Sequence, residues 1–239
     1  MDYFNNKPSR YSPDLLAAEE RGSKDLRSVF QWLGRNRDLR ILEVGCGAGS
    51  LQLALRERGY TRCHGIDLNS EFVRHGLKVL GVNIETATWR QYLESSDYLY
   101  DVIIALDVLE HLPKEELVAT LRASRAHLSS TGLLIIRTPN ALCPFVLPTL
   151  YGDLTHQFVI TPLACKGLLR TAGFEGEITT KETRPTGVLA NILFVAVHWC
   201  LVKPLLGLTH YHFHGEFPSH ITPNIIVCAK ASAQERARA

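Results

Sequence analysis

Three glycines at alternate positions mark the first stretch of the chain whose residue types could do chemistry. The segment "ILEVGCGAGS" places an apolar run and a glutamate before the glycines at 45, 47 and 49, and a leucine-rich segment follows. Glycines let the backbone approach a ligand closely and adopt positive φ, while free N–H groups at a helix start favour an electron-rich or anionic group. The pattern predicts a nucleotide cradle, although a tight strand-to-helix turn without a ligand would use the same glycines.

An aspartate ends the next apolar run, "CHGID", roughly 20 residues beyond the glycines. An acid at this place can accept hydrogen bonds from both hydroxyls of a ribose. Together, the glycines and Asp67 indicate a ligand that contains adenosine. A dinucleotide enzyme would share both features.

Two histidines are placed to act as a general base. His111 follows an apolar run in "LDVLEHLP", where we expect the carboxyl edge of a sheet, the edge at which open α/β folds bind ligands. His156, in "YGDLTHQFVITP", lies on a loop expected at the same edge. An imidazole titrates near neutral pH and can take a proton from an acceptor there. His156 is the first candidate; the alternatives are a wall of the cofactor site for His111 and a solvated loop position for His156.

The composition bounds the class of protein. A chain of 239 residues with 46% apolar residues can bury one large core. The net charge of +2 gives no strong field for a nucleic acid, so no nucleic-acid partner is expected. Six dispersed cysteines without a CxxC pair, and a polar start unlike a secretory leader, predict reduced thiols in a cytoplasmic protein.

Seven short apolar runs predict strands, and segments with helical spacing separate most of them. The helical segments include 51–58, 71–80 and 114–128. This alternation predicts a doubly wound α/β fold with a mostly parallel, seven-stranded sheet. The predicted strands are 39–44, 63–67, 82–87, 100–106, 133–138, 175–180 and 224–229.

Four motifs together resemble those of class I S-adenosylmethionine-dependent methyltransferases: "ILEVGCGAGS", "GIDLNSEFV", "DVIIALDVLEHL" and "GLLIIRTPN". The resemblance implies a Rossmann-like fold, S-adenosylmethionine as cofactor and S-adenosylhomocysteine as product. It implies that Asp67 binds the ribose, that Leu68 lies against adenine and that Asp107 forms the wall behind the sulfonium. The residues implied for the methionine end of the cofactor are Glu43, Gly45, Cys46, Gly47 and Gly49.

One departure from this family concerns adenine. Members often carry an acid after the third strand that accepts from the adenine amino group, whereas this chain has "TATWRQY". Thr88, Trp89 or Gln91 would have to substitute for it.

The segment "GDLTHQFVITPLACKGLLRTAGF" is similar to a pattern in methyltransferases of bacterial sugar and surface-polysaccharide biosynthesis. It implies a hydroxyl acceptor on a sugar, glycan or related small molecule. Methyl transfer from a sulfonium is an in-line displacement. Most of the reduction in the activation barrier can therefore come from holding the acceptor and the methyl group in line. A base then helps by removing the hydroxyl proton.

Two other functions stay open. Asp107, Glu110, His111 and His156 form an oxygen and nitrogen set that could bind Mg²⁺ or Mn²⁺, and small-RNA 2′-O-methyltransferases resemble the chain in their Glu-His pair. We favour a site without metal, because "DVLEHL" is widespread in metal-independent methyltransferases and no basic or aromatic platform for RNA is evident. A methyltransferase-like fold retained as an inactive binding module is the other alternative.

The predicted organisation has four parts. An N-terminal helical segment, 1–38, covers the cofactor site; 39–183 form the α/β core; 184–223 form a cap inserted before the last strand; 224–239 form that strand and a tail. Four histidines in "HYHFHGEFPSH" (His210, His212, His214 and His220) are expected to line the acceptor entrance rather than to bind metal.

Within the predicted cap, residues 186–208 have only His198 and Lys203 as ionisable groups and are borderline in length for a membrane span. A span would separate the last strand from the sheet with which it must pair. We therefore expect either a helical cap over the acceptor or an interfacial element that contacts a membrane or a lipid-linked substrate, at the inner membrane face.

Overall fold

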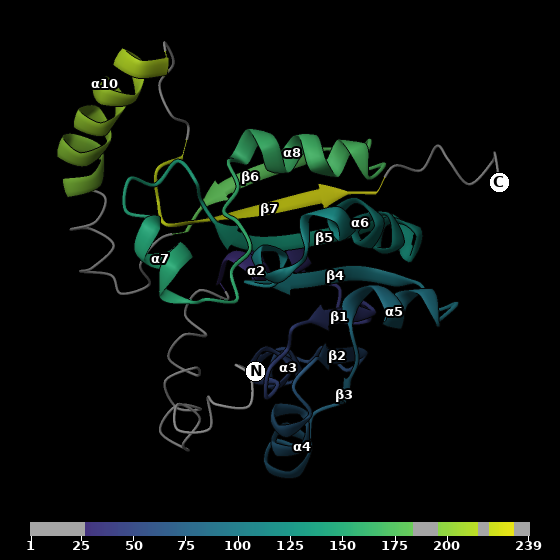
Figure 1. Ribbon diagram of the computed structural model, residues 1–239. Helices are drawn as coiled ribbons and strands as arrows, with labels where there is room; N and C mark the ends of the chain where they lie inside the picture. Colours follow the sequence, from purple (N-terminus) through teal and green to yellow (C-terminus); the bar gives the residue numbers. More distant parts are fainter. Residues whose placement is uncertain (1–26, 184–195, 215–219, 232–239) are drawn as a thin grey trace.

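A single seven-stranded sheet forms the centre of the computed structural model, which describes residues 27–183, 196–214 and 220–231 (Figure 1). The strand order is β3-β2-β1-β4-β5-β7-β6. β1 to β5 pair in parallel, and β7 pairs antiparallel with both β5 and β6. The predicted mostly parallel, Rossmann-like sheet is confirmed. The strands are β1 (Ile41–Val44), β2 (Cys63–Asp67), β3 (Ile84–Thr86), β4 (Tyr100–Leu106), β5 (Leu128–Pro139), β6 (Ile178–Glu182) and β7 (Asn224–Lys230).

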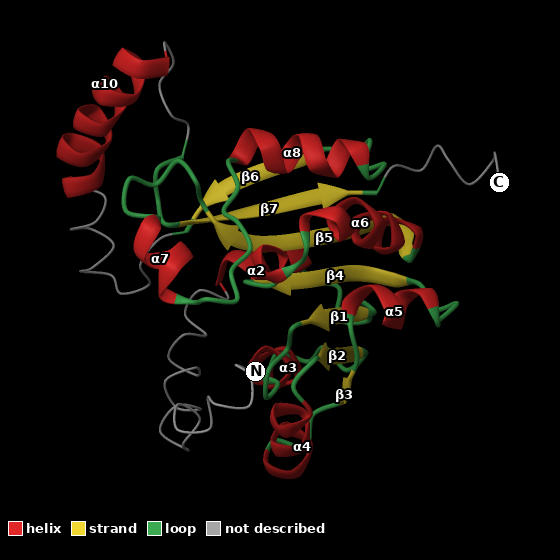
Figure 2. Cartoon of the chain, in the orientation of Figure 1, coloured by secondary structure: helices red, strands yellow, loops and turns green. Residues whose placement is uncertain are grey.

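Helices cover both faces of this sheet (Figure 2). One face carries α2 (Arg27–Leu33) and α3 (Ser50–Glu57), and the other carries α5 (Trp89–Glu94), α6 (Leu117–Ala126) and α8 (Pro162–Thr171). The remaining helices are α4 (Ser70–Val79), α7 (Leu147–Gly152), α10 (Lys203–His214), the 3₁₀ turns η4 (Leu109–His111) and η5 (Lys114–Glu116), and the π-helical turn η6 (His198–Val202).

The alternation of side chains along the central strands produces two apolar layers. Leu42 and Ile103 lie in the layer beneath α5, α6 and α8, whereas their neighbours Ile41 and Ile104 lie in the layer beneath α2 and α3. Because helices bury both faces, these strands are continuous apolar runs in the sequence. Burying one Ile or Leu side chain fully stabilises the fold by about 1.5–3 kcal/mol.

The predicted limits of one helix and of two strands were wrong. The helix expected at 114–128 ends at Ala126, and β5 begins at Leu128 instead of residue 133 because Leu128 pairs with Tyr100 of β4. The sixth strand, expected at 175–180, runs from Ile178 to Glu182 because its register is set by pairing with β7. For both strands, the partner strand rather than the local sequence decides where pairing begins.

In the insertion before β7, η6 and α10 are helical, whereas the described residues 220–223 form neither helix nor strand. Residues 184–195 and 215–219, which belong to the predicted cap, and residues 1–26 of the predicted N-terminal segment lie outside the described residues. Their roles over the cofactor and the acceptor stay predictions. Among the residues that the structure describes, no helix is long and apolar enough to cross a membrane.

Candidate active site

The glycine turn joins β1 to α3 in the left-handed conformation that the sequence predicts. Gly45 has φ 68°, and a Cβ atom there would lie 2.3 Å from Cγ2 of Val108, so glycine allows this turn to approach the loop after β4. Gly47 has φ 54°, and a Cβ atom on it would meet no atom within 4 Å. The open side of the turn at Gly47 is therefore a backbone surface that a ligand can approach, which fits the predicted cofactor cradle.

Asp67 lies at the carboxyl end of β2, directly beside this turn. Its Oδ2 accepts from the N–H of Gly47 at 2.8 Å and its Oδ1 accepts from the N–H of Asn69 at 2.7 Å. Burial raises the pKa of Asp67, and the two backbone hydrogen bonds oppose that rise. Leu68, the next residue, is 64% exposed and offers an apolar surface next to the predicted ribose site.

Glu43 and Cys46 line the buried side of the same turn. Glu43 is buried on β1, and its Oε2 accepts from Nε2 of Gln52 at 2.9 Å. Burial, together with the negative charges of Glu43 and Asp67, raises the pKa of the Cys46 thiol. That thiol is therefore neutral, and Cys46 serves as a small apolar wall rather than as a nucleophile.

The residues predicted to replace the adenine-binding acid lie at the start of α5. The Thr88 hydroxyl donates to Oε1 of Gln91 at 2.9 Å, and the Trp89 side chain is buried in the apolar layer. All three line a cavity of about 420 Å³ between α5 and α6. Their contact with adenine stays a prediction. The other lining residues are Arg90, Glu94, Leu112, Glu116 and Thr120.

Asp107 follows β4 and is the one non-glycine residue with positive φ (56°) in the described parts of the chain. Arg137 of β5 donates to it from Nε at 2.9 Å and from Nη2 in an ion pair. This two-point contact fixes the plane of the carboxylate and balances its charge. Sequence reasoning missed Arg137, although a lone arginine within the apolar run "LLIIRTP" could have indicated an acidic partner.

His111 and His156 come together from distant parts of the sequence. His111 lies in η4 after β4, His156 lies after α7, and their ring centroids are 4.6 Å apart. The two loops are joined by the N–H of Gln157, which donates to the carbonyl oxygen of Glu110 at 2.8 Å. Both predicted base candidates therefore occupy one place at the carboxyl edge of the sheet.

Hydrogen bonds fix the tautomer of His156. Its Nδ1 lies 2.8 Å from the carbonyl oxygen of Thr149, and only a protonated Nδ1 can donate to a carbonyl. In the neutral ring, Nε2 is then the atom with the basic lone pair. Sequence reasoning missed Thr149, because a backbone carbonyl leaves no signature in residue type.

A second set of hydrogen bonds orients His111. The Thr155 hydroxyl donates to Oδ1 of Asp153 at 2.7 Å and lies 2.8 Å from Nδ1 of His111. Since its one proton is directed at Asp153, Thr155 accepts from a protonated Nδ1 of His111. Thr155 was also missed from the sequence.

Glu110, directly before His111 in η4, is 1% exposed. Burial, and next the negative charge of Asp107, raise the pKa of Glu110 to about 8; the Thr138 hydroxyl donates to its Oε2 at 3.2 Å. A metal ion could be held by Glu110, His111 and His156. Each offers one ligand atom, and these three atoms lie within 4.8 Å of one another. Asp107, the fourth member of the metal set considered from the sequence, is instead paired with Arg137.

The histidines predicted at the acceptor entrance are only partly described. His220 places Nε2 3.3 Å from the carbonyl oxygen of Thr180, near β6. His210 is half-buried in α10, and the side chains of His212 and His214 lie outside the described residues. Their position relative to an acceptor stays a prediction.

One known protein family matches more than half of the chain. A family described as "Methyltransferase domain" matches residues 16–177. The chain belongs to this methyltransferase family. The expected cofactor, S-adenosylmethionine, and its product, S-adenosylhomocysteine, are thereby confirmed.

Similar proteins of known name are also methyltransferases. The magnesium-protoporphyrin O-methyltransferase of Synechocystis is 31% identical over 132 residues, which are 52% of this chain and 56% of the relative. A ubiquinone biosynthesis O-methyltransferase of Rickettsia felis is 34% identical over 110 residues, 43% of this chain and 42% of the relative. The chain thus spans about half the length of the curated relatives it matches.

Solved structures share the fold. A methyltransferase from Archaeoglobus fulgidus covers 96% of this methyltransferase and 100% of its own chain, with a TM-score of 0.65 and 21% identity. The magnesium protoporphyrin IX methyltransferase of Synechocystis with bound S-adenosylhomocysteine covers 90% of this chain and 84% of its own, with a TM-score of 0.58 and 18% identity. The predicted resemblance to enzymes of sugar and polysaccharide biosynthesis is not confirmed by these proteins.

Proposed function

We propose that this methyltransferase transfers a methyl group to a hydroxyl oxygen of a sugar, glycan or related small molecule, with His156 as general base. The observation that carries the proposal is the hydrogen bond from Nδ1 of His156 to the carbonyl oxygen of Thr149, at 2.8 Å. Relatives named as O-methyltransferases, one for magnesium-protoporphyrin and others in ubiquinone biosynthesis, support oxygen as the accepting atom.

When bound, S-adenosylmethionine supplies an electrophilic methyl group with a neutral thioether as leaving group. The glycine turn and Asp67 would hold the cofactor, and the loop after β4 would orient the acceptor beside it. Nε2 of His156 would take the proton of the acceptor hydroxyl, whose oxygen would receive the methyl group. The Thr149 carbonyl then stabilises the imidazolium through Nδ1.

A metal-assisted reaction, as in RNA 2′-O-methylation, is the second candidate, and the cluster of Glu110, His111 and His156 favours it. Nδ1 of His156 is directed at Thr149, so an ion would have to bind Nε2. That is the atom that acts as base in the first mechanism. The two mechanisms therefore exclude each other at His156, and a chelator separates them.

The test is methyl transfer from isotopically labelled S-adenosylmethionine to panels of nucleotide sugars, glycans, phenols, porphyrins and short RNAs, with and without chelator. The proposal expects an O-methyl product from a small hydroxyl acceptor in the presence of chelator. Transfer only to RNA, only with a divalent metal, or only to nitrogen would contradict it.

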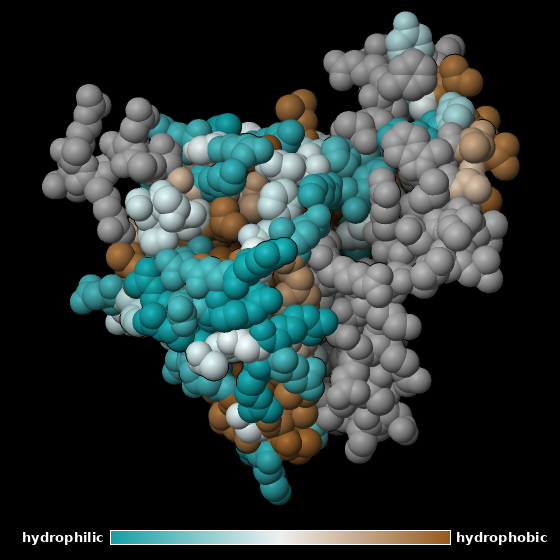
Figure 3. Space-filling model, turned by 180° about the vertical axis from the view of Figure 1, so that it is seen from behind, coloured by the Kyte–Doolittle hydropathy of each residue, from teal (hydrophilic) through white to brown (hydrophobic). Residues whose placement is uncertain are grey.

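We further propose that residues 196–208, the described part of the segment 186–208, contact a membrane surface or a lipid-linked acceptor. Three leucines repeat at helical spacing and are all exposed: Leu201 of η6, and Leu205 and Leu208 of α10. Figure 3 shows apolar side chains on the part of the surface that α10 forms. Vesicle flotation checks this proposal: replacing the three leucines with asparagine is expected to abolish binding to anionic vesicles. Equal flotation of both proteins would contradict it.

A further inference from the structure

Three segments of the chain meet at Asn140, the residue that follows β5 and is fully buried. Its Nδ2 donates to the carbonyl oxygens of Thr222 at 2.9 Å and His220 at 3.1 Å. Its Oδ1 accepts from the N–H of Leu142 at 3.0 Å. One buried amide thus joins the end of β5 to the start of the next loop and to the residues that precede β7.

The loop that begins after Asn140 carries the proposed base. We name residues 141–160 the base loop, because they include His156 and also Thr149, whose carbonyl oxygen holds Nδ1 of His156. Asn140 forms a parallel bridge with Ile160 at the far end of this loop. Asn140 therefore lies where the two ends of the base loop meet.

The residues before β7 are held at the sheet by contacts of their own. The N–H of Ile221 donates to Oε1 of Glu182 at 2.8 Å, and Nε2 of His220 lies 3.3 Å from the carbonyl oxygen of Thr180. Both partners belong to β6. The insertion thus ends at a point that is fixed to the sheet, and Asn140 connects the base loop to that point.

The chemistry of an amide suits this position. Two carbonyl oxygens require donors and one backbone N–H requires an acceptor, and the short side chain of asparagine supplies both kinds of group. An aspartate would place a carboxylate oxygen against two carbonyl oxygens, and a serine would bring one donor for both. Each replacement keeps an acceptor for the N–H of Leu142 and weakens the connection to residues 220 and 222.

We propose that Asn140 is a positioning residue for methyl transfer, which holds the base loop where Nε2 of His156 reaches the acceptor hydroxyl. The inference rests on the proposed function in that His156 is the base. Displacing a reacting group by about 1 Å can lower a rate about 10²-fold, even when the change lies far from the chemistry. Asn140 acts through the base loop rather than through the glycine turn, so cofactor affinity should not depend on it.

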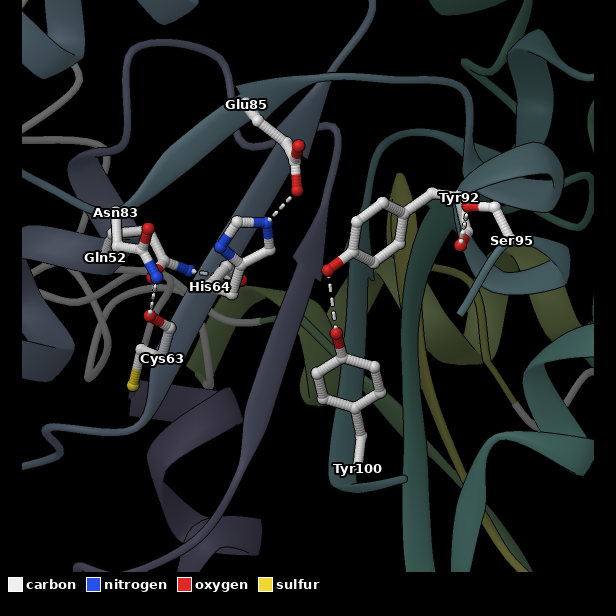
Figure 4. Close-up of polar contacts among 8 residues, drawn as sticks. All are labelled: Gln52, Cys63, His64, Asn83, Glu85, Tyr92, Ser95 and Tyr100. Carbon is white, nitrogen blue, oxygen red and sulfur yellow. Dashed lines mark hydrogen bonds and ion pairs between the residues drawn. The ribbon is translucent and has the colours of Figure 1, made fainter. Parts of the chain in front are cut away.

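The experiment compares Asn140→Asp with a matched substitution elsewhere, Asn83→Asp. Asn83 is exposed before β3, and its Nδ2 donates to the carbonyl oxygen of Cys63 at 3.4 Å (Figure 4). Asn140→Asp is expected to lower kcat by about 10–10²-fold and to change the affinity for S-adenosylhomocysteine, measured by calorimetry, less than about twofold. Asn83→Asp should change neither value.

NMR of the ¹⁵N-labelled protein gives a readout that a loss of stability alone would not move. Because Nδ1 of His156 donates to the Thr149 carbonyl, the wild-type protein should show a hydrogen-bonded Nδ1–H signal, which His156→Gln removes and thereby assigns. Folded Asn140→Asp is expected to lose this signal, since the base loop is displaced. If Asn140→Asp fails to fold, Asn140→Ser should show the same losses of signal and of kcat to a smaller extent.

Wild-type kcat or an intact Nδ1–H signal in the folded variants would overturn the inference and make Asn140 a support of stability alone. A loss of cofactor affinity as large as the loss of kcat would also overturn it. If the wild-type protein shows no such signal, the observation behind the proposed function fails together with the inference. If Asn140→Asp loses the signal but the wild-type protein methylates no hydroxyl acceptor, only the proposed function fails.

Discussion

The imidazole rings of His111 and His156 lie 4.6 Å apart and are tilted by 57°, although one follows β4 and the other follows α7. Their Nδ1 atoms are held by different groups, the Thr155 hydroxyl and the Thr149 carbonyl. Each ring thus has a fixed tautomer beside the predicted cofactor site. Two oriented imidazoles at one place can share or exchange the role of base, so variants must be made at each in turn.

His156→Ala is expected to lower kcat by about 10²–10⁴, the usual contribution of a general base. Affinity for S-adenosylmethionine should be nearly unchanged, because the glycine turn and Asp67 are not altered. His156→Gln, which keeps a hydrogen-bonding group without the base, should be nearly as slow. Wild-type turnover in both variants with the true acceptor would leave His111 as the remaining candidate.

Asp67→Ala is expected to weaken binding of S-adenosylmethionine by about 2–3 kcal/mol, the scale of lost charge-assisted hydrogen bonds. Part of that loss comes from the turn, since Asp67 also holds the N–H groups of Gly47 and Asn69. Asp67→Asn keeps one acceptor oxygen and should lose less. Titration calorimetry gives both values, and wild-type affinity in the alanine variant would remove Asp67 from the site.

Chelator treatment is expected to leave turnover unchanged, and metal analysis should find no stoichiometric ion. Glu110→Gln is the sharper test, because with a pKa of about 8 the Glu110 carboxyl is already protonated at pH 7. A neutral glutamine should then support near-wild-type turnover at that pH. Activity lost on chelation, restored by Mg²⁺ or Mn²⁺ and absent in the glutamine variant would establish the metal-assisted mechanism.

Asp101→Asn is expected to destabilise the fold in a pH-dependent way. Arg40 donates to Asp101 from Nε at 2.9 Å and Nη2 at 2.8 Å, and this contact lowers the pKa of Asp101 from 3.8 to about 2. A folded-state pKa below the unfolded one stabilises the protein above pH 4, and this stability is lost as pH falls toward 2. The difference in unfolding free energy should be about 2 kcal/mol near pH 6.

Urea unfolding of the wild-type and Asp101→Asn proteins at several pH values measures this difference. Asp38→Asn, at an exposed position in the loop before β1, is the control and should show no such dependence. A difference that stays constant from pH 6 to pH 2 would show that the ion pair is not its source.

The sequence by itself determined the parts of this methyltransferase that depend on local chain geometry. The glycines before α3 come directly after one apolar run, and Asp67 ends the next one. Because parallel strands bring their carboxyl ends to one edge of the sheet, both could be placed at that edge from the sequence. For the same reason, His111 could be placed at that edge from its position after the fourth apolar run alone.

The tertiary structure decided which of these residues meet and in what chemical state. Strand order sets Arg137 of β5 beside Asp107, and the contact between the loops after β4 and α7 brings His156 to His111. The raised pKa of Glu110 follows from its burial, and the hydrogen bond from Gln52 to Glu43 follows from how α3 packs against β1. Such contacts join residues distant in the chain, and their energies depend on burial and distance, which residue type and spacing do not encode.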